Sequence, residues 1–289
     1  MKVAGFTFIK NAIIYDYPVV EAIQSILPIC DEVYVALGKS DDDTEALILS
    51  IDPTKIKIIK TLWDETLKQG GQVLAAETNK AFQAIPTYYD WCFYIQGDEV
   101  IHEKYLPIVK QAMLTYKSHK RVDGLLFKYL HFYGSYDYIG NSSKWYNNEI
   151  RVVKNNKKIY SYKDAQGFRK NDDEKLHVKA IDAYIYHYGW VKDPRAMQRK
   201  QEEFHKLWHN QEWIDKNVVK ADAFDYSKID SLARFEDIHP KVMQKRIAEK
   251  NWQFEFDLNY NKTKLKDQFK KFAAKYLGWE IGYKNYKRI

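Results

Sequence analysis

The chain has 289 residues and a formal net charge of +7, and its last 29 residues carry nine Lys and Arg against two acids, so the preceding 260 are neutral. A nucleic-acid-binding domain is basic across its binding face, so this distribution argues against that class. A hydrophobic content of 45% excludes a disordered chain, no apolar run reaches the roughly 18 residues of a membrane span, and two cysteines are too few for a disulfide framework.

The N-terminal third alternates short apolar runs with segments of helical periodicity. Strands are expected at residues 3–9, 32–37, 55–60 and 91–95, and helices at 16–27, 44–50 and 70–85. This alternation predicts parallel strands with helices on both faces of the sheet. Ligands bind such sheets at the carboxyl ends of the strands. The segments at those ends are Lys10–Asn11, Gly38–Thr44, Trp63–Glu65 and Gln96–Glu99.

The fourth expected strand runs directly into the adjacent carboxylates Asp98 and Glu99. Two hard oxygen ligands at a sheet edge suit Mg²⁺ or Mn²⁺ bridging a diphosphate. On spacing alone, a solvated turn that caps a helix starting near Glu103 is an equal alternative. The chain has no GxxxxGK[ST] and no GxGxxG loop for phosphates. If it binds a nucleotide, carboxylates with a divalent cation are therefore the expected means.

Three segments resemble the family 2 glycosyltransferases, which are nucleotide-sugar-dependent enzymes of the GT-A fold. In chain order they are Phe6–Asn11, Val33–Thr44, and Gly71–Asn79 followed by Asp90–Val100. The resemblance covers about residues 1–130. It implies an α/β fold with a Rossmann-like mixed sheet flanked by helices, in which Asn11, Ser40 and Asp41 lie near the nucleotide and Asp98 binds the metal, with Glu99 beside it.

The sequence departs from the family pattern at two places. Gln96 stands where the family's Asp-x-Asp motif has its first Asp. The carboxylate that contacts the base after the second strand is missing near Leu37–Gly38, where Ser40 or Asp41 could substitute.

Further strands are expected at residues 121–133, 145–154 and 183–188. His187 ends the last of these among aromatic residues, and Gly189 after it permits close backbone approach. The resemblance to GT-A enzymes with a late histidine puts His187 on the metal or diphosphate, and imidazole suits Mn²⁺. Lys192 would then pair with a phosphate as a point charge. A core histidine with a backbone partner is the alternative.

An inverting transferase needs a general base near the acceptor hydroxyl. Asp164 lies on a loop after the strand that contains Arg151 and has aromatic neighbours, so we expect it to be the base. The alternative is an ordinary surface carboxylate, which is how the charge run at residues 172–174 is interpreted.

The C-terminal part is expected to be mainly helical, with helices at residues 194–209 and 240–250 forming an acceptor-side cap. His205 and His209 have the spacing of a metal pair but no HExxH pattern, which favours a helix surface. In the basic tail, an apolar stripe is formed by Leu265, Phe269, Phe272 and Tyr276, and other faces carry Lys264, Lys266, Lys270, Lys271 and Lys275. Such a helix predicts contact with anionic lipid, or else docking on the body.

We therefore predict a catalytic domain at residues 1–192, a cap at 193–260 and a basic tail at 261–289. The predicted function is inverting, Mn²⁺- or Mg²⁺-dependent transfer of a sugar from a nucleotide-diphosphate sugar to a glycan or lipid-linked acceptor, with no nucleic-acid partner. The resemblance implies cell-surface polysaccharide synthesis by a cytoplasmic protein, peripheral at the inner membrane surface. The alternatives are a nucleotidyltransferase acting on sugar phosphates, whose usual Gly-rich loop is missing, and a non-catalytic glycan- or nucleic-acid-binding module.

Overall fold

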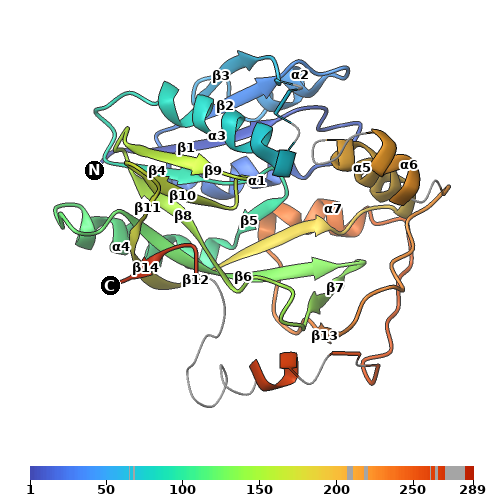
Figure 1. The fold of residues 1–289 in the computed structure, drawn as a ribbon. Helices are drawn as coiled ribbons and strands as arrows, with labels where there is room; N and C mark the ends of the chain where they lie inside the picture. The colour runs from blue at the N-terminus through green and yellow to red at the C-terminus, as the bar shows by residue number, and fades with distance from the viewer. Residues whose placement is uncertain are drawn as a thin grey trace.

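The computed structural model describes residues 1–64, 66–67, 69–206, 211–217, 221–260, 262–263, 266–270 and 284–289 (Figure 1). A large mixed sheet with helices on both faces confirms the predicted α/β fold class. Across this sheet the strand order is β3 (Ile56–Thr61), β2 (Glu32–Gly38), β1 (Val3–Ile9), β4 (Trp91–Tyr94), β8 (Asn148–Lys154), β6 (Gly124–Tyr133), β7 (Ser135–Gly140) and β13 (Leu232–Arg234).

The strands of the N-terminal third, β1 to β4, are parallel to one another, as their alternation with helices predicts. The predicted bounds of β1 are confirmed, and those of β2, β3 and β4 differ by one residue at one or both ends. The connecting helices are α1 (Val19–Ile26), α2 (Thr44–Leu49) and α3 (Gln72–Ala84). Parallel pairing brings the carboxyl ends of these strands to one edge of the sheet, where the predicted ligand segments begin.

Both faces of β1, β2 and β4 are buried, which is why these strands read as nearly continuous apolar runs. Successive side chains point to opposite faces. Val33 and Val35 of β2 belong to the core under α1 and α4 (Leu106–Tyr116). Tyr34 and Ala36 belong to the core under α3. A small separate sheet extends this second cover, and its strands are β9 (Ile159–Tyr162), β10 (Gly167–Lys170) and β11 (Glu174–Lys175).

A long strand, β12 (His177–Trp190), crosses the molecule beside β6 and is longer than the predicted 183–188. It pairs in parallel with β6, where His187 is opposite His131. Through its other edge it pairs antiparallel with β5 (Glu99–Ile101), where His187 is opposite Glu99. This double pairing carries His187 from the second half of the chain to the end of β4, where Asp98 lies.

The C-terminal extension, residues 193–260, lies along one end of the sheet (Figure 1). Its helices are α5 (Pro194–Lys206), α6 (Gln211–Asn217) and α7 (Gln244–Ala248), with a 3₁₀ turn at Lys241–Met243. Figure 1 shows α5 and α6 side by side at this end. The predicted helix 194–209 is seen to Lys206, and its remaining residues, with His209, lie outside the described part. The extension is not purely helical, because β13 joins the main sheet antiparallel to β7.

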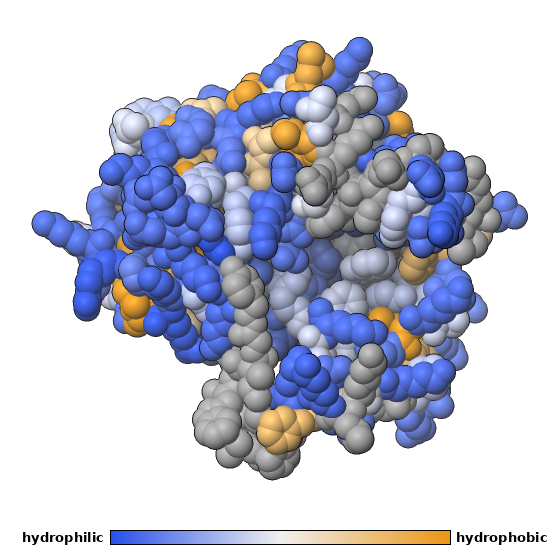
Figure 2. Space-filling model, viewed as in Figure 1, coloured by the Kyte–Doolittle hydropathy of each residue, from blue (hydrophilic) through white to orange (hydrophobic). Residues whose placement is uncertain are grey.

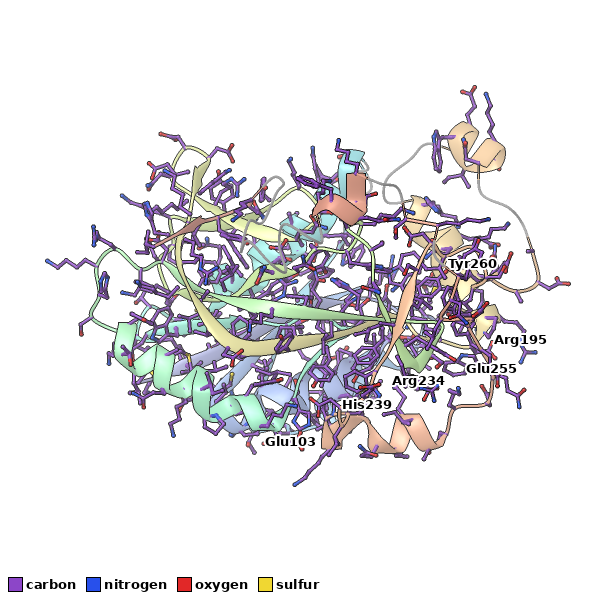
Figure 3. All side chains as sticks on the ribbon, turned by 90° about the horizontal axis from the view of Figure 1, so that it is seen from below. Glu103, Arg195, Arg234, His239, Glu255 and Tyr260 are labelled. Carbon is purple, nitrogen blue, oxygen red and sulfur yellow. The ribbon has the colours of Figure 1, made fainter. Side chains whose placement is uncertain are left out.

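The extension is fastened to the body by polar contacts as well as by an aromatic core. His239, labelled in Figure 3, accepts a hydrogen bond at Nδ1 from Tyr188 Oη (2.8 Å) and donates from Nε2 to the carbonyl of Tyr136 (3.0 Å). Arg246 of α7 forms ion pairs with Asp16 and Glu21, which flank the start of α1. The face of the molecule drawn in Figure 2 is mainly hydrophilic, with hydrophobic residues in small separate patches.

The last six residues of the basic tail return to the body. β14 (Lys287–Arg288) pairs in parallel with the start of β12. Residues 266–270 are helical, and Phe269 is 60% exposed. The rest of the predicted stripe (Leu265, Phe272 and Tyr276), together with Lys264, Lys271 and Lys275, lies outside the described residues. Within the described ranges, no helix has the length and hydropathy to span a membrane.

Candidate active site

A cavity of about 670 Å³ opens at the carboxyl ends of β1, β2 and β4, the edge at which a parallel sheet is expected to bind ligands. Its volume is in the range of small-molecule sites. Its polar lining includes Asn11, Asp41, Asp98, Asp164, His187 and Lys200. All of these except Lys200 are predicted site residues, so the fold brings together side chains that are far apart in the sequence. The other predicted site residues, Ser40, Glu99 and Lys192, are not among the residues that line the cavity.

Asn11 and Asp41 face the cavity as a hydrogen-bonded pair. The side-chain amide of Asn11 donates to Asp41 Oδ2 (3.2 Å), and the backbone N–H of Asp41 donates to Asn11 Oδ1 (2.7 Å). Ser40 Oγ accepts the backbone N–H of Asn11 (3.0 Å) and donates to the carbonyl of Gly38 (3.0 Å). Ser40 therefore fixes the backbone of Asn11 relative to the end of β2. Asn11 has a left-handed backbone (φ 52°), which Asn tolerates better than most residues.

Asp98 lies between a lysine and a histidine from two other elements. Lys200 Nζ, from α5, donates to Asp98 Oδ2 (3.1 Å) and to the carbonyl of Gly189 (2.9 Å). His187 Nε2 lies 3.7 Å from Asp98 Oδ1. Burial raises the pKa of Asp98, but the ammonium of Lys200, together with His187 in the protonated form that it adopts at low pH, outweighs it and holds that pKa well below its usual range. A carboxylate at this position is therefore ionised at neutral pH.

Gly189 is required by this arrangement, because a Cβ there would lie 2.6 Å from Asp98 Oδ2 and 2.8 Å from the His187 ring. Close approach of the backbone is the role predicted for Gly189 from the sequence.

His187 is held by a second histidine, His131 of β6. Their Nδ1 atoms are 3.2 Å apart, and His131 Nε2 lies 2.8 Å from the carbonyl of Tyr146. Burial lowers the pKa of His131 to about 3 and also lowers that of His187, so both rings are neutral at neutral pH. His131 must therefore donate a hydrogen bond from Nε2 to the carbonyl of Tyr146, and its Nδ1 accepts a hydrogen bond from the N–H at His187 Nδ1. This assignment leaves the lone pair of His187 Nε2 facing Asp98.

Glu99 is buried in the core and does not line the cavity. Arg151 donates to both of its oxygens, from Nη2 to Oε1 (2.7 Å) and from Nε to Oε2 (2.8 Å). Tyr129 Oη and the backbone N–H of Gln96 add further hydrogen bonds to the same carboxylate (2.8 and 3.1 Å). Since both of its oxygens already accept hydrogen bonds, Glu99 stabilises the end of β4 from within the core. It does not present a free oxygen to the cavity, which differs from the metal ligand that the sequence predicts.

Lys192 is turned away from the cavity as well. Its ammonium donates to the carbonyl of Asp16 and lies 4.7 Å from the centre of the Tyr17 ring. Burial, with Lys200 nearby, lowers the pKa of Lys192 to about 7. Lys200 does line the cavity, as does Lys10. Burial opposes the charge of Lys200, but Tyr17 and Asp98 outweigh it and raise its pKa. Lys192, which is predicted to pair with a phosphate, is therefore not among the residues that line this cavity, whereas Lys200 is.

Asp164 reaches the cavity from the turn between β9 and β10. Its neighbours Lys163 and Ala165 both have left-handed backbones (φ 53° and 63°), which is uncommon for residues other than Gly, Asn and Asp. Such conformations cluster at functional sites. Burial raises the pKa of Asp164, which makes its carboxylate a stronger base than one in water. The environment therefore suits the predicted general base.

Gln96 ties this turn to the end of β4. Its side-chain amide donates to the carbonyl of Ala165 (3.4 Å) and to Tyr94 Oη (3.2 Å). Arg151 Nη1 donates to the carbonyl of Gln166 in the same turn (3.2 Å). A carboxylate at position 96 could not donate these bonds. The departure from Asp-x-Asp thus has a structural counterpart in this chain.

The residues present do not form a ready divalent-cation site. Among the described residues there is no group of three or more His, Cys, Asp and Glu side chains placed to hold a metal. Lys200 already pairs with Asp98 Oδ2, and Glu99 pairs with Arg151. Among the described groups at the end of β4, a cation would find Asp98 Oδ1 and His187 Nε2 open, beside an ammonium that repels it.

Lys200, His131 and Arg151 contribute to this candidate site but were not singled out by the sequence analysis. His131 becomes significant only through the register that sets it opposite His187. Lys200 lies on a polar helix whose path back over the cavity has no sequence signal. Arg151 lies in a strand that was recognised, but its buried partner Glu99 was predicted to face a metal.

No family model and no curated protein matches the sequence. Among solved structures, the chain is similar to a 1–349 fragment of S. aureus TarS in complex with UDP, with 13% identity and a TM-score of 0.42 over 70% of this chain and 64% of the fragment. It is also similar to glucosyl-3-phosphoglycerate synthase from Mycobacterium tuberculosis in complex with Mn²⁺, UDP and phosphoglyceric acid, with 15% identity and a TM-score of 0.31 over 45% of this chain and 43% of that one. A third similar structure is 4-diphosphocytidyl-2C-methyl-D-erythritol synthase from Anaerococcus prevotii, with 11% identity and a TM-score of 0.37 over 63% of this chain and 87% of that one.

The chain thus spans less than two thirds of the length of the first two of these proteins. At these identities and TM-scores the similarity carries no weight for the chemistry of the site.

Proposed function

We propose that the chain is a glycosyltransferase that takes its sugar from a nucleotide-diphosphate sugar. One observation supports this above the others. The three segments that resemble family 2 glycosyltransferases contribute Asn11, Asp41 and Asp98, and these side chains line one cavity. A donor site needs such convergence, because the nucleoside, diphosphate and sugar of one molecule must be held together.

The polar groups of the cavity divide into three parts with different chemistry. Asn11 and Asp41 offer amide and carboxylate groups that suit the hydroxyls of a ribose or the edge of a base. Lys200 with Asp98 and His187 forms the charged part, which suits the diphosphate. Asp164 enters from the separate small sheet, which suits the acceptor. The base and the donated sugar follow from none of these groups alone.

Transfer in this site would be a single displacement with inversion at the sugar carbon. The acceptor hydroxyl oxygen forms a bond to C1 of the sugar, while the bond from C1 to the diphosphate oxygen breaks and its electron pair leaves with the diphosphate. The acceptor proton passes to Asp164. A raised pKa makes proton transfer to this carboxylate more favourable. The sequence resemblance implies Mn²⁺ or Mg²⁺ dependence, whereas the displacement described above uses only side chains of this cavity.

The test is nucleotide release from a panel of UDP-, GDP-, CDP- and dTDP-sugars, with thermal unfolding measured for each nucleotide. We expect one nucleotide to raise the Tm and its sugar to be turned over. Asp98→Asn should abolish turnover while the protein remains folded, and Asp172→Asn, in an exposed turn, should behave as wild type. If no nucleotide changes the Tm and no donor is consumed, the proposal is wrong.

We further propose a glycan or lipid-linked acceptor, with the lysine-rich tail in peripheral contact with an anionic membrane surface. The net charge of +7 within residues 261–289 supports this, because each Lys near an anionic surface contributes about 1 kcal/mol. Sedimentation with phosphatidylglycerol vesicles should fall as salt is added. Binding that is absent at low salt would contradict the membrane contact and leave the transferase proposal intact.

A further inference from the structure

We propose that Lys200 supplies the positive charge that faces the donor diphosphate, in place of a divalent cation, so that nucleotide binding does not require a metal. This inference rests on the proposed function, since it assigns a role within the same donor site. It concerns a residue on α5, beyond the part of the chain that resembles the transferase family.

The first support is the position of the ammonium. It lies 3.1 Å from Asp98 Oδ2, so one oxygen of the carboxylate expected to bind a metal is already paired with a cation. A lysine ammonium has three N–H donors. Asp98 and the carbonyl of Gly189 accept two of them, and among the described residues no third hydrogen-bond acceptor is seen for this ammonium, which also lies 5.0 Å from the centre of the Tyr17 ring. Lys200 itself lines the cavity, so a phosphate that enters can accept a hydrogen bond from it directly.

The second support is a contrast between two buried lysines that lie eight positions apart. Both ammonium groups lie near the Tyr17 ring, at 4.7 Å for Lys192 and 5.0 Å for Lys200. Lys192 has its hydrogen bond to the carbonyl of Asp16 and is not part of the described lining. Lys200 instead forms a salt bridge with Asp98, and both residues line the cavity. The fold thus buries one lysine in a structural position and presents the other to the ligand.

The third support is that the ion pair leaves little attraction for a second cation. One carboxylate, Asp98, is balanced by one ammonium, Lys200. A divalent ion on Asp98 Oδ1 would lie close to that ammonium and be repelled by it. The remaining candidate carboxylate, Glu99, is committed to Arg151 by two hydrogen bonds. Metal binding would therefore require Lys200 to leave its partner.

The role in the reaction follows from the charge balance. When the bond from the sugar C1 to the diphosphate oxygen breaks, the electron pair stays on that oxygen, and the leaving nucleoside diphosphate gains one unit of negative charge. A fixed ammonium beside that oxygen stabilises the charge as it develops. No oxidant, reductant or further reactant is needed. The acceptor proton still goes to Asp164.

The test is isothermal titration of the full-length protein with UDP, GDP, CDP, ADP and dTDP, each in EDTA and then in Mn²⁺. We expect one nucleotide to bind in EDTA with the affinity that it has in Mn²⁺. Binding that occurs only with Mn²⁺ would overturn the role of Lys200 and leave the proposed function standing. If no nucleotide binds in either buffer, the proposed function fails and this inference fails with it.

Three variants separate the role of Lys200 from a general effect of charge. Lys200→Met should weaken binding in EDTA by at least about tenfold, the effect of losing one hydrogen bond to a charged group. Lys200→Arg keeps a cation on Asp98 and should retain part of the affinity, so it remains informative if the Met variant is unstable. Arg199→Met removes a positive charge from the neighbouring exposed position of α5 and should bind as wild type. Equal affinity of Lys200→Met and Arg199→Met would overturn the inference.

Discussion

His131 fixes the tautomer of His187. Its own Nε2 donates to the carbonyl of Tyr146 (2.8 Å), so its Nδ1 can only accept, and the partner at 3.2 Å is His187 Nδ1. The proton of a neutral His187 is thereby held on Nδ1. The nitrogen that remains free to act as an acceptor, Nε2, is the one that faces Asp98.

Replacing His131 by Phe should release this constraint while the ring still packs between Tyr129 and Trp145. We expect turnover to fall about 10- to 100-fold, as for other residues that orient a functional histidine. Long-range ¹H–¹⁵N spectra of the imidazoles should show one tautomer of His187 in the wild type and a mixture in the variant. His119→Phe, at an exposed position, is the control. An unchanged His187 spectrum in His131→Phe would contradict the assignment.

Asp164→Asn should reduce kcat by about 10²- to 10⁴-fold, the usual contribution of a general base. Nucleotide affinity should stay as in the wild type, because Asp164 faces the acceptor. A base acts when deprotonated, so the rate should rise as pH increases through the pKa of Asp164. Since burial raises that pKa, the rise should lie above the ordinary range of an aspartate. Stopped assays across pH, with Asp172→Asn as control, measure both effects.

Glu99→Gln should destabilise the protein by about 3–5 kcal/mol, because it leaves the buried Arg151 without a counter-charge. Replacing both residues, as in Glu99→Leu with Arg151→Met, should recover part of that loss, since no buried charge is then unpaired. Urea unfolding of the three proteins gives the comparison. If Glu99→Gln were as stable as the wild type but lost Mn²⁺ binding, the originally predicted metal role of Glu99 would be restored.

Glu149 is expected to be protonated at neutral pH. Burial raises its pKa to about 8, and within the described part of the chain its Oε2 has no hydrogen-bond partner. The folded state therefore binds more protons than the unfolded state between the ordinary glutamate pKa of about 4.3 and about 8. Its contribution to stability is complete below that window and is lost as pH rises through it.

Glu149→Gln should remove this pH dependence. Near pH 5 the variant and the wild type should be similarly stable, because both side chains are neutral. Near pH 9 the variant should be more stable by a few kcal/mol, since one pKa unit corresponds to about 1.36 kcal/mol. Denaturant unfolding at the two pH values measures the difference. Parallel stability curves for the two proteins would contradict a raised pKa.

The parallel half of the fold could be predicted because local pattern determines it. β1, β2 and β4 are buried, so their apolar runs are almost uninterrupted. The edge strand β3 is half-exposed and contains Lys57 and Lys60. Helices α1, α2 and α3 follow β1, β2 and β3 in the chain, each with its own periodicity. β7, β9, β10 and β13 were not predicted. They are short or half-exposed, and β13 pairs with a strand that is distant in the chain, β7. β12 was only partly recognised because charged residues such as Lys179 and Asp182 interrupt its first half.

The candidate site divides in the same way. Asn11, Asp41 and Asp98 follow strands that the sequence predicts, so their convergence was foreseeable. Ser40 and Glu99 follow the same strands, but their side chains do not line the cavity. Their orientation depends on particular hydrogen-bond partners, which are the carbonyl of Gly38 for Ser40 and Arg151 for Glu99. Lys200 and His131 reach the site through tertiary packing, for which a single sequence offers no signal.

The return of the C-terminus to β12 changes how the lysine-rich stretch should be manipulated. Besides the pairing of β14, Asn285 accepts hydrogen bonds from Tyr162 and Arg169, which bracket the turn that carries Asp164. A truncation after Tyr260 would remove the lysines and this brace together, so lost membrane contact and lost catalysis could not be told apart. Charge-neutralising substitutions within residues 264–275 keep the brace in place and make the two effects separable.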